Sequence, residues 1–237
     1  MLGEALSLIL RVPAELTVAG RTDSGVHATG QVAHLDVPET VWFAYESSLV
    51  RRLSGVLPRD LRVREITPVP PDFDARFSAL RRWYVYRITD ERWGGDPLRR
   101  HDTLAWPRPL DDEAIAVAAG RLLGEHNFAA FCRRRDGATT IRELLELSVR
   151  REVDGVLSLR VSADAFCHSM VRSLVGALLA VGEGRRPASW PGELLTLPAR
   201  SSDVTVAPPH GLTLVRVDYP PDDQLATRAT LTRRLRT

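Results

Sequence analysis

Strand-like and helix-like patterns follow one another along the whole chain, and this mixture limits the possible folds more than any other feature. Strand-like alternation or β-rich composition occurs at 15–19, 31–37, 61–69, 83–89, 143–151, 155–162 and 212–217. Helical spacing of apolar residues occurs before Pro13 and at 39–56, 111–123, 163–181 and 191–197. Because both kinds of element occur in each half of the chain, the sequence predicts an α+β fold.

The chain has 237 residues, which is enough for one large domain or two small ones. A segment rich in Gly, Pro and Arg, at 92–109, is typical of a boundary loop. We therefore expect an N-terminal α+β half at 1–100 and a C-terminal α+β half at 101–221. Residues 222–237 are polar and are predicted to form a disordered tail.

Several functional classes do not fit this sequence. The longest apolar stretch, Leu174–Val181, is far shorter than the roughly 18–20 residues of a membrane-spanning helix. The first ten residues lack the basic region of a signal peptide, so a cytoplasmic location is expected. Cys132 and Cys167 are predicted to be free thiols, and no Cys/His or His/Glu spacing predicts a metal site.

All 32 basic residues are arginine, and the formal net charge is +2. The planar guanidinium group suits phosphates and base edges, but GC-rich coding explains the same bias and is the favoured explanation. Most arginine clusters on protein surfaces are simply solvated. The clusters here are Arg51-Arg52, Arg81-Arg82, Arg99-Arg100, Arg133-Arg134-Arg135 and Arg185-Arg186.

A carboxylate lies on a tight, glycine-flanked turn directly after a predicted strand. The turn is Gly20–Gly25 and the carboxylate is Asp23. Loops held by a rigid scaffold often carry active-site residues. On turn chemistry alone, an Asx-turn, in which Asp23 binds its own backbone, is the favoured alternative.

Two other segments carry candidate functional side chains. Strand alternation places Tyr84 and Tyr86 on one face of a sheet, where filling the core is a commoner use of such rings than stacking on a base. Arg172 interrupts an apolar helix, and a buried guanidinium group requires a carboxylate partner. Asp23 is a candidate for that partner, although the sequence alone cannot join the two. His168 is more typical of a hydrogen-bonded structural residue than of a catalytic base.

Five segments, in the same order, resemble the motifs of the tRNA pseudouridine synthase A family. The resemblance extends over nearly the whole chain. The segments are Gly20–Ala28 with Gly30-Gln31-Val32 and His34, Phe73–Ala79 with Tyr84, His126–Phe128 with Phe131, Ala165–Arg172, and Pro209–Leu212 with Val217–Pro220.

The resemblance implies a role for each of five residues. Asp23 would be the catalytic aspartate, and Arg172 would form an ion pair with it. Tyr84 would stack on the target base, Arg21 would help to hold the extruded nucleotide, and Leu212 would line the base pocket.

The resemblance also implies a fold, a reaction and a partner. The fold would have two pseudo-symmetric ferredoxin-like halves, whose mixed sheets join around a central active-site cleft. The enzyme would need no cofactor, act as a homodimer and isomerise uridines 38, 39 and 40 in the anticodon arm of tRNA.

The sequence departs from the family pattern in three places. Ser24 stands where Ala is usual, and the arginine stretch after Phe131 is shorter than the loop of many relatives. The family's first strand and its Tyr-Asp-Gly…Gly-Trp-Gln segment have no counterpart, because residues 1–6 correspond to the middle of the first helix. Either a truncated chain or an internal Met taken as the start would explain this, and the second is the favoured explanation.

Two alternative functions are compatible with parts of this pattern. One is an inactive, truncated RNA-binding fragment of the same family, although Asp23, Tyr84 and Arg172 are all retained. The other is a hydrolase of small glycosides, but such enzymes usually require two working carboxylates. None of the five segments supplies a second candidate.

Overall fold

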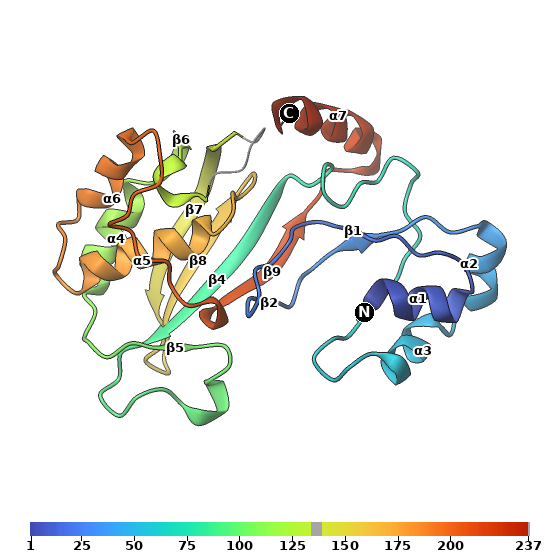
Figure 1. The fold of residues 1–237 in the computed structure, drawn as a ribbon, viewed down its shortest axis with the longest axis horizontal. Helices are drawn as coiled ribbons and strands as arrows, with labels where there is room; N and C mark the ends of the chain where they lie inside the picture. The colour runs from blue at the N-terminus through green and yellow to red at the C-terminus, as the bar shows by residue number, and fades with distance from the viewer. Residues whose placement is uncertain (134–138, 237) are drawn as a thin grey trace.

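A computed structural model describes residues 1–133 and 139–236. Its centre is a seven-stranded mixed sheet of order β2-β9-β4-β8-β7-β6, with β5 paired to β4 (Figure 1). The α+β prediction is confirmed. These strands are β2 (His27–Ala28), β4 (Arg81–Thr89), β5 (Leu104–Ala105), β6 (Gly124–Asn127), β7 (Ile141–Arg151), β8 (Leu157–Ala163) and β9 (Leu212–Asp218). A separate antiparallel pair consists of β1 (Thr17–Val18) and β3 (Ala33–His34).

The helices fall into two groups at opposite ends of the molecule (Figure 1). One group lies beside β1 and comprises α1 (Leu2–Leu10), α2 (Glu39–Tyr45) and α3 (Leu49–Val56). The other covers one face of the large sheet and comprises α4 (Asp112–Gly120), α5 (Met170–Gly182) and α6 (Trp190–Glu193). The last helix, α7 (Leu225–Arg236), follows β9.

The main hydrophobic core lies between the sheet and α5. Every residue of α5 is buried except Arg172. On β4, Tyr84, Tyr86 and Ile88 are buried, as the two-residue period of a strand requires. The segment after α6 passes very close to α5, because a Cβ atom on Gly176 would lie 1.7 Å from the carbonyl oxygen of Thr205. This close approach requires glycine.

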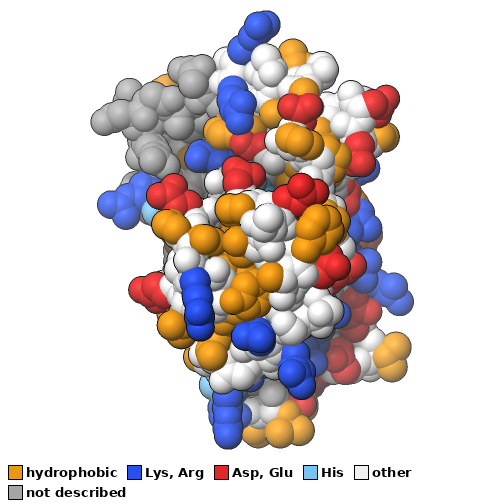
Figure 2. Space-filling view, turned by 90° about the vertical axis from the view of Figure 1, so that its right-hand side faces the viewer, with side chains coloured by type: hydrophobic (Ala, Val, Ile, Leu, Met, Phe, Trp, Pro, Cys, Tyr) orange, Lys and Arg blue, Asp and Glu red, His pale blue; other side chains and the backbone are white. Residues whose placement is uncertain are grey.

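A second, smaller core joins α1 to α3 through Leu6, Leu10, Leu49, Leu53 and Leu57. Figure 2 views this end of the molecule and shows hydrophobic side chains scattered among charged ones. Since strands from both predicted halves share one sheet, the sheet itself does not mark the division at residue 100, and that division stays a prediction.

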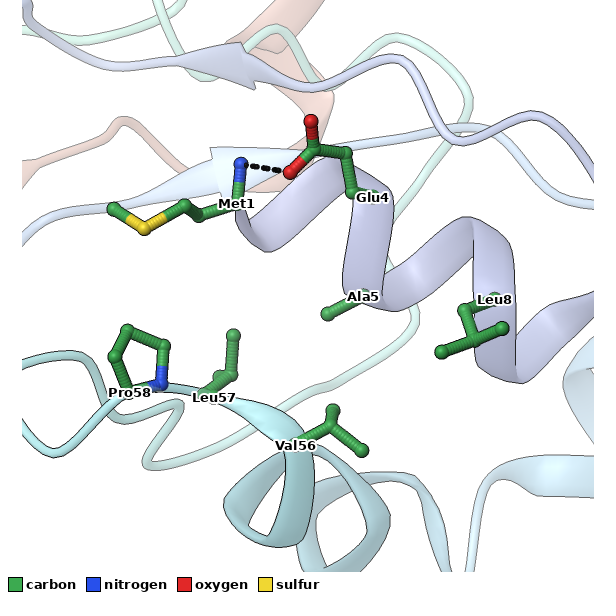
Figure 3. A pocket seen from close by; sticks show the side chains of 7 residues that line it. All are labelled: Met1, Glu4, Ala5, Leu8, Val56, Leu57 and Pro58. Carbon is green, nitrogen blue, oxygen red and sulfur yellow. Dashed lines mark ion pairs between the residues drawn. The ribbon is translucent and has the colours of Figure 1, made fainter.

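A shallow hollow lies between α1 and the end of α3 (Figure 3). Within it, the amino group of Met1 pairs with the carboxylate of Glu4 at 2.8 Å. The lining residues are Met1, Glu4, Ala5, Leu8, Val56, Leu57 and Pro58. None of the candidate functional residues lines this hollow.

Three predicted elements differ from the observed ones. The helix predicted at 39–56 is broken at 46–48, where the Ser48 hydroxyl donates to the carbonyl of Tyr45 at 3.3 Å and competes with helical hydrogen bonding. Residues 61–69 form no strand, because Leu61, Val63 and Ile66 pack against the α1–α3 core instead. The helix predicted from 163 begins only at Met170.

The prediction of a disordered tail is wrong for residues 222–236. This segment forms a short 3-10 helix, Asp222–Gln224, followed by α7. Leu225, Ala229 and Thr232 are buried, and they recur at the spacing of one helical face. The largely polar composition of the segment conceals this narrow buried stripe.

The prediction of two free thiols is also wrong. Cys132 and Cys167 form a disulfide, with their Cα atoms 5.7 Å apart. Beside them, the amide of Arg133 donates to the carbonyl of His168 at 3.1 Å. Tertiary structure brings these two segments together, and no sequence spacing could indicate it. The rest of the arginine cluster, Arg134-Arg135, lies outside the described residues.

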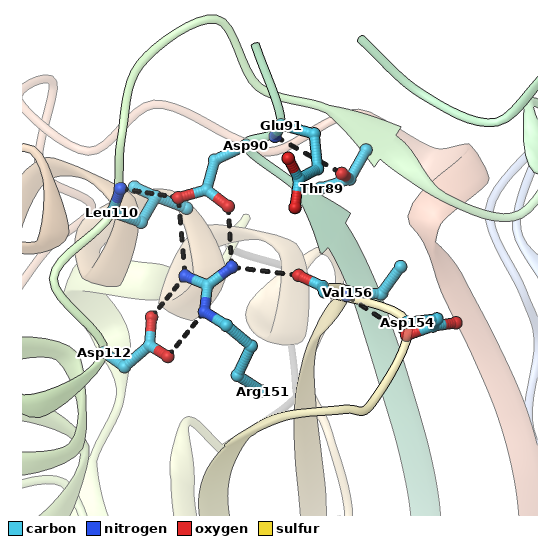
Figure 4. Close-up of polar contacts among 9 residues, drawn as sticks. Thr89, Asp90, Glu91, Leu110, Asp112, Arg151, Asp154 and Val156 are labelled. Atoms are coloured by element: carbon cyan, nitrogen blue, oxygen red, sulfur yellow. Dashed lines mark hydrogen bonds and ion pairs between the residues drawn. The ribbon is translucent and has the colours of Figure 1, made fainter. Parts of the chain in front are cut away.

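An ion-pair network ties the end of β7 to two other segments (Figure 4). Arg151 donates to Asp90 Oδ1 at 2.7 Å and to Asp112 Oδ2 at 2.8 Å. Burial alone would raise the pKa of Asp90, but hydrogen bonds from Arg151 and from the Leu110 amide outweigh it, so the pKa lies below its ordinary value. The network therefore stabilises the fold where Asp90 is ionised.

Arg151→Met is expected to lower the free energy of unfolding by about 1–2 kcal/mol at pH 7, because both carboxylates lose a donor while solvent partly screens the loss. Asp90's contribution is complete above the ordinary carboxyl pKa of 3.8 and disappears as the pH falls through the lower folded value. Urea unfolding at pH 7 and in acid measures both effects. Arg150→Met, whose side chain is 71% exposed, is the control and should change stability by less than about 0.5 kcal/mol. Equal losses in the two variants would contradict a specific role for Arg151.

Candidate active site

Asp23 lies on the loop between β1 and β2. The amide of Val26 donates to the carbonyl of Asp23 at 3.0 Å, and Gly25 has a φ of 81°, which favours glycine. Directly after this turn, β2 pairs in parallel with β9 and fixes the loop to the large sheet. The main chain thus closes the turn, and the Asp23 side chain extends toward α5, so the Asx-turn alternative does not describe this loop.

The Asp23 carboxylate meets three side chains at the N-terminal end of α5. Arg172 Nη1 donates to Oδ2 at 3.0 Å, and the Ser169 hydroxyl donates to the same oxygen at 3.3 Å. His168 Nε2 lies 3.2 Å from Oδ1. The Asp23 side chain is 25% exposed, so its oxygens are held by protein groups on one side and remain open to solvent on the other.

Arg172 is held by the main chain as well as by Asp23. Its Nε donates to the carbonyl of Ala207 at 2.7 Å, and the amide of Ala207 donates to the carbonyl of Arg172 at 3.0 Å. With 18% of its side chain exposed, the guanidinium group is well shielded. The predicted pairing of Arg172 with Asp23 is confirmed, and its second hydrogen bond fixes the orientation of the guanidinium plane.

Tyr84 comes from the middle of β4 and lies beside the Asp23 loop. Its ring packs edge-on against Phe166 with centroids 5.2 Å apart. A Cβ atom on Gly20 would lie 3.8 Å from the Tyr84 hydroxyl, so the phenol reaches the base of the loop. Burial, helped by the charge of Asp23 and opposed by Arg82, raises the pKa of Tyr84 to about 12. The phenol is therefore protonated at neutral pH.

The other two predicted residues take different positions. Leu212 begins β9 and is buried beside the β2–β9 pairing, where its partner on β4 is Tyr86. Arg21 is exposed on the loop before Asp23. The structure thus gathers Asp23, Tyr84 and Arg172 in one place, while Arg21 is exposed on the loop that carries Asp23.

Sequence reasoning missed two contributors to this arrangement. Ser169 lies inside a segment that had been singled out, yet a serine beside His168 gave no separate signal. The carbonyl of Ala207 binds Arg172 through the main chain, which no side-chain pattern can indicate. In the described ranges, 1–133 and 139–236, no three His, Cys, Asp or Glu side chains gather as a metal ion would require.

Comparison with known proteins gives the family. A family model described as tRNA pseudouridine synthase matches residues 118–220. A tRNA pseudouridine synthase A of Frankia casuarinae is 63% identical over 234 residues, which are 98% of this chain and 84% of the relative. The chain belongs to the tRNA pseudouridine synthase A family.

Other members of the tRNA pseudouridine synthase A family are similar over comparable lengths. The protein of Streptomyces avermitilis is 56% identical and the alignment covers 94% of this chain and 78% of the relative. The protein of Mycobacterium leprae is 53% identical, and the alignment covers 99% of this chain and 86% of the relative. The mixed sheet with helices on one face agrees with the pseudouridine synthase fold.

Proposed function

We propose that this chain isomerises uridine to pseudouridine in the anticodon arm of tRNA, at positions 38, 39 and 40, with Asp23 as the catalytic carboxylate. The observation that carries the proposal is the Asp23 carboxylate, fixed at 3.0 Å from Arg172 and still partly open to solvent. Membership of a family whose named relatives are tRNA pseudouridine synthases supplies the reaction.

The reaction breaks the bond between uracil N1 and ribose C1′, turns the base, and joins its C5 to C1′. The C5 proton leaves, N1 gains a proton, and the overall change involves no redox step. An ionised Asp23 can attack C1′ or remove a proton from the sugar, and both routes use the same oxygens. Arg172 and Ser169 hold Oδ2, so the carboxylate is oriented before the substrate arrives.

The base must leave the helical stack to reach Asp23, which costs on the order of a few kcal/mol. In this proposal Tyr84 caps one face of the extruded uracil, with Phe166 supporting the ring from its edge. Leu212 lines the base pocket. Arg21, exposed on the rim, contacts the backbone of the extruded nucleotide and helps to hold it out.

Affinity for tRNA is expected to come mainly from arginine contacts with phosphates and to fall as salt rises. Recognition of a folded RNA depends more on shape than on base sequence. We further propose a cytoplasmic homodimer, in line with the family resemblance; light scattering with and without tRNA would measure the assembly. Among the described residues, no helix is long and apolar enough to cross a membrane.

Tritium release from tRNA labelled at uridine C5 tests the proposed function. The wild-type chain should release tritium. Replacing the uridine at position 38, 39 or 40 by cytidine should each time lower the total release by the amount that comes from that position. Release that is unaffected by all three replacements would contradict anticodon-arm specificity. A folded protein that binds tRNA and releases no tritium would favour the inactive RNA-binding fragment.

Tyr84→Phe should keep the single-turnover rate within about threefold, because the ring remains and the protonated phenol is not needed as a base. Tyr84→Ala should lose about 1–3 kcal/mol of base stacking, which corresponds to a loss of roughly 5- to 150-fold. Quench-flow measurement on saturating tRNA gives both rates. A Phe variant as slow as the Ala variant would show that the hydroxyl, and not the ring face, carries the role.

A further inference from the structure

Arg82 is a buried arginine whose hydrogen bonds all run to the main chain of neighbouring segments. It lies on β4, two residues before Tyr84, and only 4% of it is exposed. Its Nε and Nη2 donate to the carbonyl of Ala19 at 3.2 and 2.9 Å. Nη2 also donates to the carbonyl of Arg76 at 2.7 Å, and Nη1 donates to that of Asp164 at 2.9 Å. One guanidinium group therefore joins three carbonyls.

Two of these carbonyls belong to the segments that form the candidate site. Ala19 ends the stretch that leads from β1 into the Asp23 loop. Asp164 begins the non-helical stretch between β8 and α5, which carries His168 and leads to Arg172. Arg82 is thus hydrogen-bonded both to the segment that carries Asp23 and to the segment that leads to Arg172. It lies on β4, the strand that also carries Tyr84.

The chemistry of arginine explains why this residue type suits the position. A guanidinium group is a rigid fork with five donors, whereas lysine presents a single point of charge on a flexible stem. Burying a charged group is costly unless its donors are used, and here all three nitrogens donate. The hydrogen bonds of Arg82 offset the free-energy cost of burying its charge, and they hold the three segments in one relative position.

We propose that Arg82 is a positioning residue, which fixes the Asp23 loop against the segment before α5 so that Asp23 meets His168 and Arg172. The inference rests on the proposed function for its catalytic consequence. Its structural consequence, a coupling between residues 17–26 and 164–169 through one side chain, can be measured without any activity.

The test compares Arg82→Met with Arg142→Met. Arg142 is a matched control, because it is also buried at 8% exposure and also donates to main-chain carbonyls, including that of Thr139 at 2.8 Å. Its hydrogen bonds run to the carbonyls of Ile141 and Thr139 at the β6–β7 edge, and the charge of Asp164 also acts on it. Both variants remove a buried guanidinium group, but only Arg82→Met removes hydrogen bonds to Ala19, which leads into the Asp23 loop.

Arg82→Met should lower the single-turnover rate by about 100-fold, the size expected for a displacement of about 1 Å, while tRNA affinity stays within threefold. Arg142→Met should keep the rate within threefold. Rates are expressed per tRNA-binding site, so that loss of folded protein is not counted as loss of catalysis. Arg82→Lys should remain at least tenfold slow, because the donors of an ammonium group all lie on one nitrogen and cannot reach the carbonyls that three separate guanidinium nitrogens bind.

Amide hydrogen exchange provides the readout that is independent of activity. Exchange in residues 17–26 should increase in Arg82→Met and stay unchanged in Arg142→Met, at a temperature where both variants are folded. Unchanged exchange there, or a full rate in either Arg82 variant, would overturn the proposal. A wild-type protein without activity but with this exchange difference would refute the proposed function and leave the coupling intact.

Discussion

Asp23→Asn is expected to abolish pseudouridine formation while leaving tRNA binding nearly unchanged. The amide has the same shape as the carboxylate but is neither a nucleophile nor a base of useful strength. Removing a residue that acts directly on the substrate commonly costs on the order of 10⁴-fold or more in rate. Asp23 would place one negative charge beside the bound RNA, so its loss should leave affinity equal or slightly higher.

Tritium release measures the rate, and filter binding across a salt series measures affinity. Ser24→Ala is the matched control, because Ser24 is exposed on the same loop and its substitution should keep full activity. An Asp23→Asn protein with a rate near that of wild type would remove Asp23 from the mechanism. Loss of binding together with activity would indicate instead that the substitution disorders the loop.

Arg172→Met is expected to damage both catalysis and stability. The substitution removes the donor at 3.0 Å from Asp23 and the one at 2.7 Å from the carbonyl of Ala207. Loss of one fixed electrostatic partner at a reacting group typically lowers the rate by about 10²–10³-fold. Because Asp23 is partly exposed and retains Ser169 and His168, the destabilisation should be limited to about 2 kcal/mol.

A double-mutant cycle separates the two effects. In the Asp23→Asn background, Arg172→Met should cost less free energy of unfolding than in wild type, because no carboxylate is left without its partner. Urea unfolding of the four proteins gives the coupling energy. Additive losses would show that Arg172 stabilises the fold through Ala207 alone. Arg172→Lys should restore part of the stability but not the rate, since lysine cannot bind both groups at once.

The main features of the site were accessible from the sequence for physical reasons. A guanidinium group in an apolar helix requires a partner, and the observed contact between Arg172 and Asp23 meets that requirement. The alternation in β4 placed Tyr84 on the buried face, where it lies. Strong periodicity also located β7, β8 and β9 to within a few residues.

Features that depend on tertiary contact were not accessible. The disulfide joins residues 35 positions apart, and α7 is held by a buried stripe too narrow to change its composition. Arg82 looked like half of a solvated arginine pair, because nothing in its neighbourhood along the chain reveals that it reaches Ala19 and Asp164. Every residue has a main-chain carbonyl, so the sequence cannot indicate which carbonyls will accept a hydrogen bond from a distant side chain.

The pairing of β2 with β9 has a consequence for biosynthesis. The Asp23 loop is translated long before the strand that holds it, because His27 of β2 pairs with Thr213 of β9. Until β9 is made, the Asp23 loop lacks the strand that fixes it to the large sheet, although His168, Ser169 and Arg172 have already been made, so the carboxylate is not yet held in position against them. Contacts between such distant residues also slow folding. Ribosome-bound chains that stop before β9 should therefore be unable to modify the tRNAs that surround them.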